Sequence, residues 1–293
     1  MVLVHGIGKQ YLGRLSLHGA LAAAVVDGVE RAGGEGLLTP QDIDIAFYGD
    51  VFRKRARGVR GEDEPRRVAD LDDPFEQRLL LDLWRAAAVA EPDRVAAPAA
   101  EGTRAPTPVT AQRAMNALLR SRCMPGAVAE RFLLGTLRQV RRYLNDPAIR
   151  QYAREAVTVR LTPDTAVVIG HSLGSVVAYE ALCAEPGSAG ALVTLGSPLG
   201  MPKVVFDRLE PAPLDGRGAW PHCIRSWSNL CDRHDVVASV KRLGPLFDVP
   251  GGRRRVDDHV LDNGWKVHDL GRHLTDEATG RAVLAALRAT PGL

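Results

Sequence analysis

The sequence contains no apolar run close to the roughly 18 residues that a membrane-spanning helix needs. Its apolar N-terminal stretch, MVLVHGIG, is too short for a secretory signal peptide and lacks the basic residues that precede one. These two absences argue against a helical membrane protein and against secretion. We therefore expect a soluble, cytoplasmic protein.

Cysteines are few, and none of them shows the spacing of a zinc site. The chain has four, Cys123, Cys183, Cys223 and Cys231, with no C-x-x-C pair, so we expect no structural metal. Cys223 and Cys231 are close enough in the sequence to pair in an oxidising compartment. In a reducing cytosol we expect four free thiols instead.

Strong net charge and phosphate-binding motifs are also missing. The formal net charge is +3, which is too mild to indicate nucleic acid, and the basic residues are not interleaved with aromatics. GIGK, at residues 6–9, lacks the second Gly-Lys-Ser/Thr part of a phosphate loop, and Tyr11 stands where a dinucleotide fingerprint needs glycine. We expect neither a nucleic-acid partner nor a cofactor.

The chain does contain alternating strand and helix patterns. Residues 2–4, 15–31 and 42–50 read as strand, helix and strand, which is a βαβ unit with parallel strands. The alternation resumes after residue 166, where further strands are expected at 167–169, 191–195, 224–230 and 254–261, with helices at 173–184 and 274–289, the last capped by Thr275. The sequence therefore predicts a single α/β domain over 1–293, with a mostly parallel sheet flanked by helices.

A long helical segment interrupts this alternation, and we expect it to be an insertion over residues 53–155. It begins with a charged loop at 53–70 and contains a Pro/Ala-rich linker at 92–108. Helices are expected at 75–90, 111–122 and 127–144, with a helical continuation over 147–154. Its apolar stripe is interpreted either as a lid over a site or as ordinary core. Its arginines, Arg131, Arg138, Arg141 and Arg142, either contact anionic lipid or an acidic substrate, or are simply solvated.

The segment VVIGHSLGSVVAYEAL, from Val167 to Leu182, predicts a nucleophile elbow. In a G-x-S-x-G turn, a strained bend between strand and helix exposes the serine hydroxyl. Gly170 and Gly174 flank Ser172 here, and a Cβ at either glycine would collide with neighbouring backbone. Ser172 is therefore the candidate nucleophile, provided that a base lies within hydrogen-bond reach.

Acyl transfer also needs hydrogen-bond donors for the developing oxyanion. The backbone N–H after the nucleophile, that of Leu173, is one candidate. The loop LVHGIGKQ follows an earlier strand, and the N–H of Ile7 in this loop is the second.

The acid and the histidine are expected further along the chain, in that order. SWSNLCDRHDVVAS contains Asp232 and Asp235. We favour Asp235, because Val236 and Val237 let the chain turn back into a packed element directly after it. His259 lies inside a predicted strand, which leaves His268 and His273 in the loop before the last helix. His268 is better placed to reach Ser172, since His273 stands where that helix begins.

With these segments in place, the chain resembles the α/β-hydrolase superfamily, and more narrowly bacterial serine esterases and lipases related to the GPI-inositol-deacylase-like group. The matching segments are LVHGIGKQY, VVIGHSLGSVVAYEAL, LVTLGSPLG, NLCDRHDVV and DNGWKVHDLGRHLTDEATGRAV. The resemblance implies a Ser172–His268–Asp235 triad, with no metal and no cofactor. The chain departs from the family pattern in two ways: we expect it to lack the first antiparallel strands of the full fold, and to carry the insertion over residues 53–155.

Three functions are compatible with these residues. The first is hydrolysis of carboxylic esters by an esterase or lipase, on a small-molecule or lipid substrate and with transient contact between the insertion and a lipid surface. The second is acyl transfer to an alcohol by the same triad. The third is a binding module on the same fold, against which the intact set of candidate catalytic residues argues.

Overall fold

The computed structural model describes residues 1–53, 67–98, 108–123, 129–184, 189–252 and 254–289. These residues form an α/β protein whose six-stranded sheet is parallel throughout, with strand order β2-β1-β3-β4-β5-β6. The strands are β1 (Val2–Val4), β2 (Asp44–Ala46), β3 (Val167–His171), β4 (Ala191–Leu195), β5 (Ser226–Asp232) and β6 (Val256–Leu261). The expected α/β class and parallel pairing are confirmed.

The central strands read as continuous apolar runs because helices cover both faces of the sheet. Every residue of β3 and β4 is buried. Side chains of successive residues point to opposite faces, so that Leu3 and Ile169 belong to one apolar cluster while Val4 and Val168 belong to the other.

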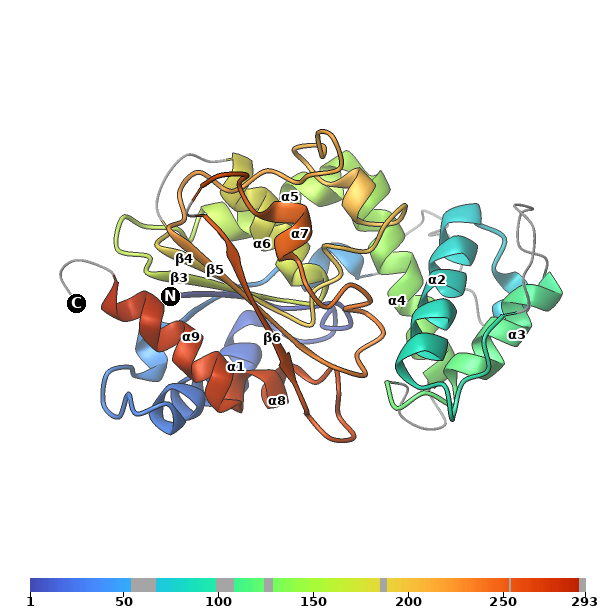
Figure 1. The fold of residues 1–293 in the computed structure, drawn as a ribbon, viewed down its shortest axis with the longest axis horizontal. Coiled ribbons are helices and arrows are strands. Elements are labelled where there is room, and N and C mark those ends of the chain that lie inside the picture. The colour runs from blue at the N-terminus through green and yellow to red at the C-terminus, as the bar shows by residue number, and fades with distance from the viewer. Residues whose placement is uncertain (54–66, 99–107, 124–128, 185–188, 253, 290–293) are drawn as a thin grey trace.

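Two helical layers enclose the sheet (Figure 1). One face packs against α1 (Arg14–Arg31), α8 (Leu270–Thr275) and α9 (Glu277–Arg288). The other packs against α5 (Pro147–Thr158), α6 (Leu173–Ala184) and the short α7 (Gly244–Phe247).

The remaining helices of the described residues come from the predicted insertion. They are α2 (Pro74–Ala90), α3 (Pro108–Leu118) and α4 (Ala129–Asn145). In Figure 1, α2 and α3 stand to one side of the sheet, and α4 leads from them back to α5 and α6. The last helix of the segment, α5, lies against α6, so it belongs to the layer that covers the sheet. Much of the expected charged loop (54–66) and of the expected linker (99–107) lies outside the described residues.

Three local expectations are wrong. The second strand is shorter than expected, because residues 40–42 and 49–52 form 3₁₀ turns on either side of it. Thr275 does not cap the last helix: α8 ends there, and the side chain of Asp276 caps α9 by accepting a hydrogen bond from the backbone N–H of Ala278 at 2.8 Å. His273 therefore lies within α8 and not in a loop.

Candidate active site

The sheet has a switch point between β1 and β3. The chain leaves β1 to form β2 on one side and later returns to form β3 on the other, so the carboxyl ends of β1 and β3 are neighbours. Ligands of open α/β sheets bind in the crevice at such a point. The loop at His5–Gly6 follows β1, and Ser172 follows β3, so the sheet brings these two predicted segments together.

Ser172 occupies a strained backbone conformation at this edge. Its φ is +52°, in the left-handed region that residues with a side chain seldom adopt. Its N–H donates to the carbonyl oxygen of Leu195 at 3.0 Å, and its own carbonyl oxygen accepts from the N–H and the hydroxyl of Ser175 at 2.9 and 2.6 Å. Neighbouring backbone thus holds the bend that aims the Ser172 side chain.

The two flanking glycines are required by close backbone approach, as the sequence predicted. A Cβ at Gly170 would lie 2.6 Å from the Cα of Ser175, and a Cβ at Gly174 would lie 2.3 Å from the carbonyl oxygen of His5. The helix α6 can therefore start directly against the β1 and β3 ends only if both positions lack a side chain.

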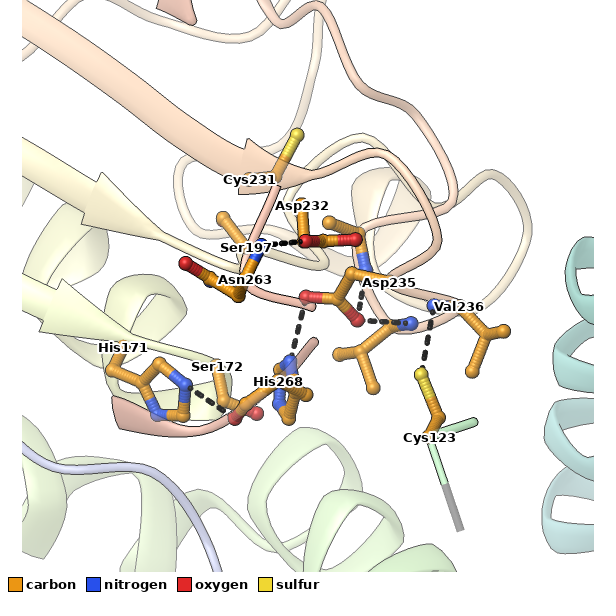
Figure 2. Close-up of polar contacts among 12 residues, drawn as sticks. Cys123, His171, Ser172, Ser197, Cys231, Asp232, Asp235, Val236, Asn263 and His268 are labelled. Carbon is orange, nitrogen blue, oxygen red and sulfur yellow. Dashed lines mark hydrogen bonds and ion pairs between the residues drawn. The ribbon is translucent and has the colours of Figure 1, made fainter. Parts of the chain in front are cut away.

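The favoured acid and histidine contact each other beside Ser172 (Figure 2). The Nδ1 of His268 donates to Oδ2 of Asp235 at 2.7 Å, while Oδ1 of Asp235 accepts from the N–H of Val237 at 2.9 Å. Since the carboxylate accepts at Nδ1, the Nε2 of His268 is left as the basic nitrogen. Burial of Asp235 opposes its ionisation, but the charge and hydrogen bond of His268, followed by the charge of Lys241, hold its pKa below the usual value.

The alternative acid and histidines have other contacts. Asp232 is buried and accepts from the N–H of His234 at 2.7 Å and from the N–H of Asn263 at 2.5 Å, so it joins two loops and does not contact His268. His259 lies on β6, as expected, and pairs with Asp257 at 2.8 Å. His273 is fully buried in α8, where burial lowers its pKa. The structure therefore brings Asp235 and His268 together, as we favoured.

Both predicted oxyanion donors line the same cavity as Ser172 and His268. Leu173 is the first residue of α6, where a backbone N–H has no partner within the helix. The loop that carries Ile7 passes against the serine, since a Cβ on Gly6 would lie 3.0 Å from the Cβ of Ser172. Neither the N–H of Ile7 nor that of Leu173 donates to another backbone group of the described residues.

Three residues that support this arrangement were not predicted from the sequence. Gly196 has φ +53°, and a Cβ there would lie 2.8 Å from Oδ2 of Asp235 and 3.0 Å from Nδ1 of His268. Lys241 donates from Nζ to the carbonyl oxygens of Asp232 and Asp235 at 2.9 and 2.5 Å, which holds the acid loop. A glycine directly after a strand was the available signal for Gly196, whereas nothing local marks Lys241.

His171 is the third residue that was missed. Its Nε2 donates to the carbonyl oxygen of His268 at 3.2 Å, and its ring lies 4.7 Å from the ring of His268. Burial, followed by the charges of His268, His273 and Lys9, lowers the pKa of His171 well below the usual value. A neutral His171 therefore positions the backbone of the candidate base.

A cavity of about 800 Å³ opens at the site. Its lower wall, here called the floor, is formed by the loops at the carboxyl edge of the sheet and by the start of α6. Its upper wall, here called the roof, is formed by Leu79 and Leu83 of α2 and by Phe132, Leu133, Thr136 and Val140 of α4. The apolar stripe of the insertion thus faces both the protein core and the cavity.

The insertion also contacts the acid loop. The Nδ1 of His234 donates to the carbonyl oxygen of Ala90 at 2.9 Å, and the N–H of Val236 donates to Sγ of Cys123 at 3.5 Å. Two of the four predicted arginines are partly internal: Arg141 pairs with Glu76 at 2.6 Å, and Arg142 lies over the ring of Phe52. Arg141 therefore connects two helices of the insertion, and Arg142 connects the insertion to the residue just before it. Both roles are structural.

Within the described residues there is no group of three side chains suited to hold a metal ion, and no helix is long and apolar enough to cross a membrane. All four cysteines are free. Comparison of the chain with protein-family models, with curated proteins and with solved structures gave no match. Fold and site together define an α/β protein with a cavity at the switch point of its parallel sheet.

Proposed function

We propose that this chain is a serine hydrolase of carboxylic esters, with the α/β-hydrolase fold that the sequence resembles. The observation that carries the proposal is that the strained Ser172 lines one cavity with His268, whose Nδ1 is bound by the buried Asp235 behind it. Further support comes from the chain order Ser172, Asp235, His268, which is the order in α/β-hydrolases. The strand-to-helix bend at Ser172 is the matching local geometry.

In the proposed reaction, Nε2 of His268 takes the hydroxyl proton of Ser172 while Oγ forms a bond to the acyl carbon. The carbonyl electron pair moves onto oxygen, where the N–H groups of Ile7 and Leu173 stabilise the negative charge. The bond to the alcohol oxygen then breaks, and His268 returns its proton to that oxygen. Water, deprotonated by the same nitrogen, next attacks the acyl-enzyme, which releases the acid and restores Ser172.

Asp235 acts on His268 in this scheme, and its pKa supports that role. A lowered pKa keeps the carboxylate ionised at neutral pH. The ionised carboxylate holds the proton on Nδ1 and stabilises the imidazolium that forms when Nε2 accepts a proton. Its burial strengthens this interaction because water does not screen it.

A fluorophosphonate probe tests the proposal, because it labels only an activated serine. We expect one adduct, on Ser172, that disappears in Ser172→Ala and in His268→Gln. Ser16→Ala and His18→Gln are matched controls on α1, across the sheet from the site, and both should label normally. Unlabelled protein should hydrolyse p-nitrophenyl esters and labelled protein should not, and adding an alcohol acceptor shows whether the acyl group passes to water.

An absence of label on a folded protein that also leaves these esters intact would overturn the proposal. The chain would then be a binding module with the same cavity. Circular dichroism on each variant separates loss of the site from loss of the fold.

A further inference from the structure

The described residues do not neutralise all of the positive charge that lines the cavity. Four basic side chains line it, and one of them, Arg94, pairs with Glu91 at 3.4 Å. The other three, Lys9, Arg122 and Lys266, form no ion pair with any acidic side chain of the described residues. The nearby carboxylates of the described residues are engaged: Glu91 accepts from the hydroxyl of Ser121 and the backbone N–H of Arg122, Asp269 caps α8 through the N–H of Arg272, and Asp235 binds His268.

These three cations come from three different loops that meet around the proposed reaction centre. Lys9 follows the proposed oxyanion donor Ile7 by two residues, and Lys266 precedes His268 by two. Arg122 stands next to Cys123, whose thiol contacts the N–H of Val236 beside Asp235. Lys9 lines the same cavity as His171 and Ser172.

Apart from these cations, the side chains that line the cavity are mainly apolar. The roof presents Leu79, Leu83 and Phe132, while Met201 and Val205 lie on the opposite wall. Such walls suit an acyl chain, and they lower the local dielectric around a bound anion. Lys266 lies over the ring of Trp265, with Nζ 5.0 Å from the ring centre. A neutral ester would nevertheless give none of the three cations an anionic partner, whereas a phosphate would accept charge-assisted hydrogen bonds from them.

We propose that the ester substrate carries a phosphate group, which binds Lys9, Arg122 and Lys266 while the acyl chain lies against the roof. This inference rests on the proposed function and narrows its substrate class. The phosphate belongs either to a lipid headgroup or to a soluble acyl ester, and both present the same chemistry to these side chains.

The test compares two esters that differ only in the phosphate: 1-octanoyl-glycerol and 1-octanoyl-glycerol 3-phosphate. At low salt we expect kcat/KM to be about tenfold or more higher for the phosphate ester, the effect of one charge-assisted hydrogen bond. That ratio should fall in Lys9→Gln, Arg122→Gln and Lys266→Gln. It should also fall at about 1 M salt, where charges are screened within about 3 Å.

Arg281→Gln is the matched control, because Arg281 lies on α9, across the sheet, and pairs with Glu277. It should leave both rates unchanged. Equal rates on the two esters, unaffected by salt or by the three substitutions, would overturn the phosphate subsite and leave the proposed hydrolase intact.

If neither ester is hydrolysed, calorimetric binding of both to the Ser172→Ala variant decides the inference separately. Tighter binding of the phosphate ester supports the subsite, and equal affinity overturns it. A hexadecanoyl phosphate ester in phosphatidylcholine vesicles then separates the two sources. Faster turnover from vesicles than of the eight-carbon ester identifies a membrane lipid, and the reverse identifies a soluble ester.

Discussion

The floor and the roof of the cavity are built by different means. The floor is held by backbone hydrogen bonds, by glycines in close contact and by buried polar side chains such as Asp232 and Asp235. The roof is held by apolar side chains of α2 and α4 and by ion pairs between side chains, such as Arg141 with Glu76.

Because of this difference, we expect the floor and the roof to respond differently to substitutions. Backbone contacts in the floor leave no space for added atoms, so a small change there displaces the proposed catalytic groups. Side-chain packing in the roof can be altered at a cost in stability while the floor keeps its geometry. We therefore expect floor substitutions to change the chemistry and roof substitutions to change stability and substrate preference.

The largest effect is expected for Asp235→Asn in the floor. An amide can neither hold the proton on Nδ1 of His268 by ionic attraction nor stabilise the imidazolium, so kcat should fall about 10⁴-fold. Steady-state kinetics on a p-nitrophenyl ester measure this loss. Asp232→Asn is the control, since Asp232 is equally buried but does not contact His268. Equal losses of kcat in both variants would contradict the assignment of Asp235.

The next largest effect is expected at Glu180, where the roof helix α4 contacts the floor helix α6. Glu180 on α6 is fully buried and accepts from the hydroxyl of Tyr143 on α4 at 2.6 Å and from Nε of Arg150 on α5 at 2.8 Å. Glu180→Ala leaves a buried guanidinium without this partner, so the free energy of unfolding should fall by about 3–5 kcal/mol. Urea denaturation measures it. Glu155 on α5 is exposed, so Glu155→Ala should change the free energy of unfolding by less than about 0.5 kcal/mol. An equally small change in Glu180→Ala would show that Glu180 does not stabilise the contact between roof and floor.

The pH dependence of stability tests the buried histidines of the floor. Burial lowers the pKa of His5 from 6.5 to about 4. Between these two pH values, His5 therefore binds a proton in the unfolded chain but not in the folded chain. Stability should therefore fall by about 3 kcal/mol through His5 alone as the pH drops from 6.5 to 4. His171 shifts in the same direction and adds to the loss. Urea denaturation from pH 7 to pH 4 should show a shallower dependence for His5→Gln than for the unchanged chain, and parallel curves would contradict the buried, neutral His5.

Gly196→Ala tests whether the floor lacks space beside the histidine. The new methyl group would lie within 3.0 Å of Nδ1 of His268, so kcat should fall about 10²-fold as the imidazole is displaced. Gly36→Ala is the control, since Gly36 also has a positive φ but faces open space. Both variants should lose similar stability, measured as Tm, and only Gly196→Ala should lose kcat. A Gly196→Ala variant with full activity would show that the floor can adjust.

The smallest effect is expected in the roof. Leu83→Ala removes a buried side chain that lines the cavity, so it should cost about 2 kcal/mol of stability and shift the preference towards longer acyl esters. Leu17→Ala on α1 is the control, because Leu17 is equally buried on the other face of the sheet. It should lower stability without changing the acyl preference across a p-nitrophenyl ester series. The same preference in both variants would show that the roof does not contact the acyl chain.

Much of the fold and the candidate nucleophile can be predicted from local patterns in the sequence. The apolar runs at 167–169 and 191–195 predict buried parallel strands, because both faces of such strands must be covered. Gly170, Ser172 and Gly174 mark the bend, since a left-handed residue between close backbones leaves few other choices. These features depend on contacts within a few residues, and such contacts can be read from the sequence.

The partners of Ser172 depended on tertiary structure. Asp232 is the last residue of β5 and Asp235 stands three residues later, and only the turn between them decides which carboxylate reaches His268. Gly196 and Lys241 act through contacts between loops that the sheet brings together. Such contacts leave no periodic pattern in the sequence. Likewise α5 reads as part of the insertion but lies against α6, because its packing partner lies beyond the next strand. The strands, the helices and the bend at Ser172 can thus be predicted from local sequence. The side chains that surround Ser172 depend on the packing of distant loops, since burial and close contact are properties of the folded chain.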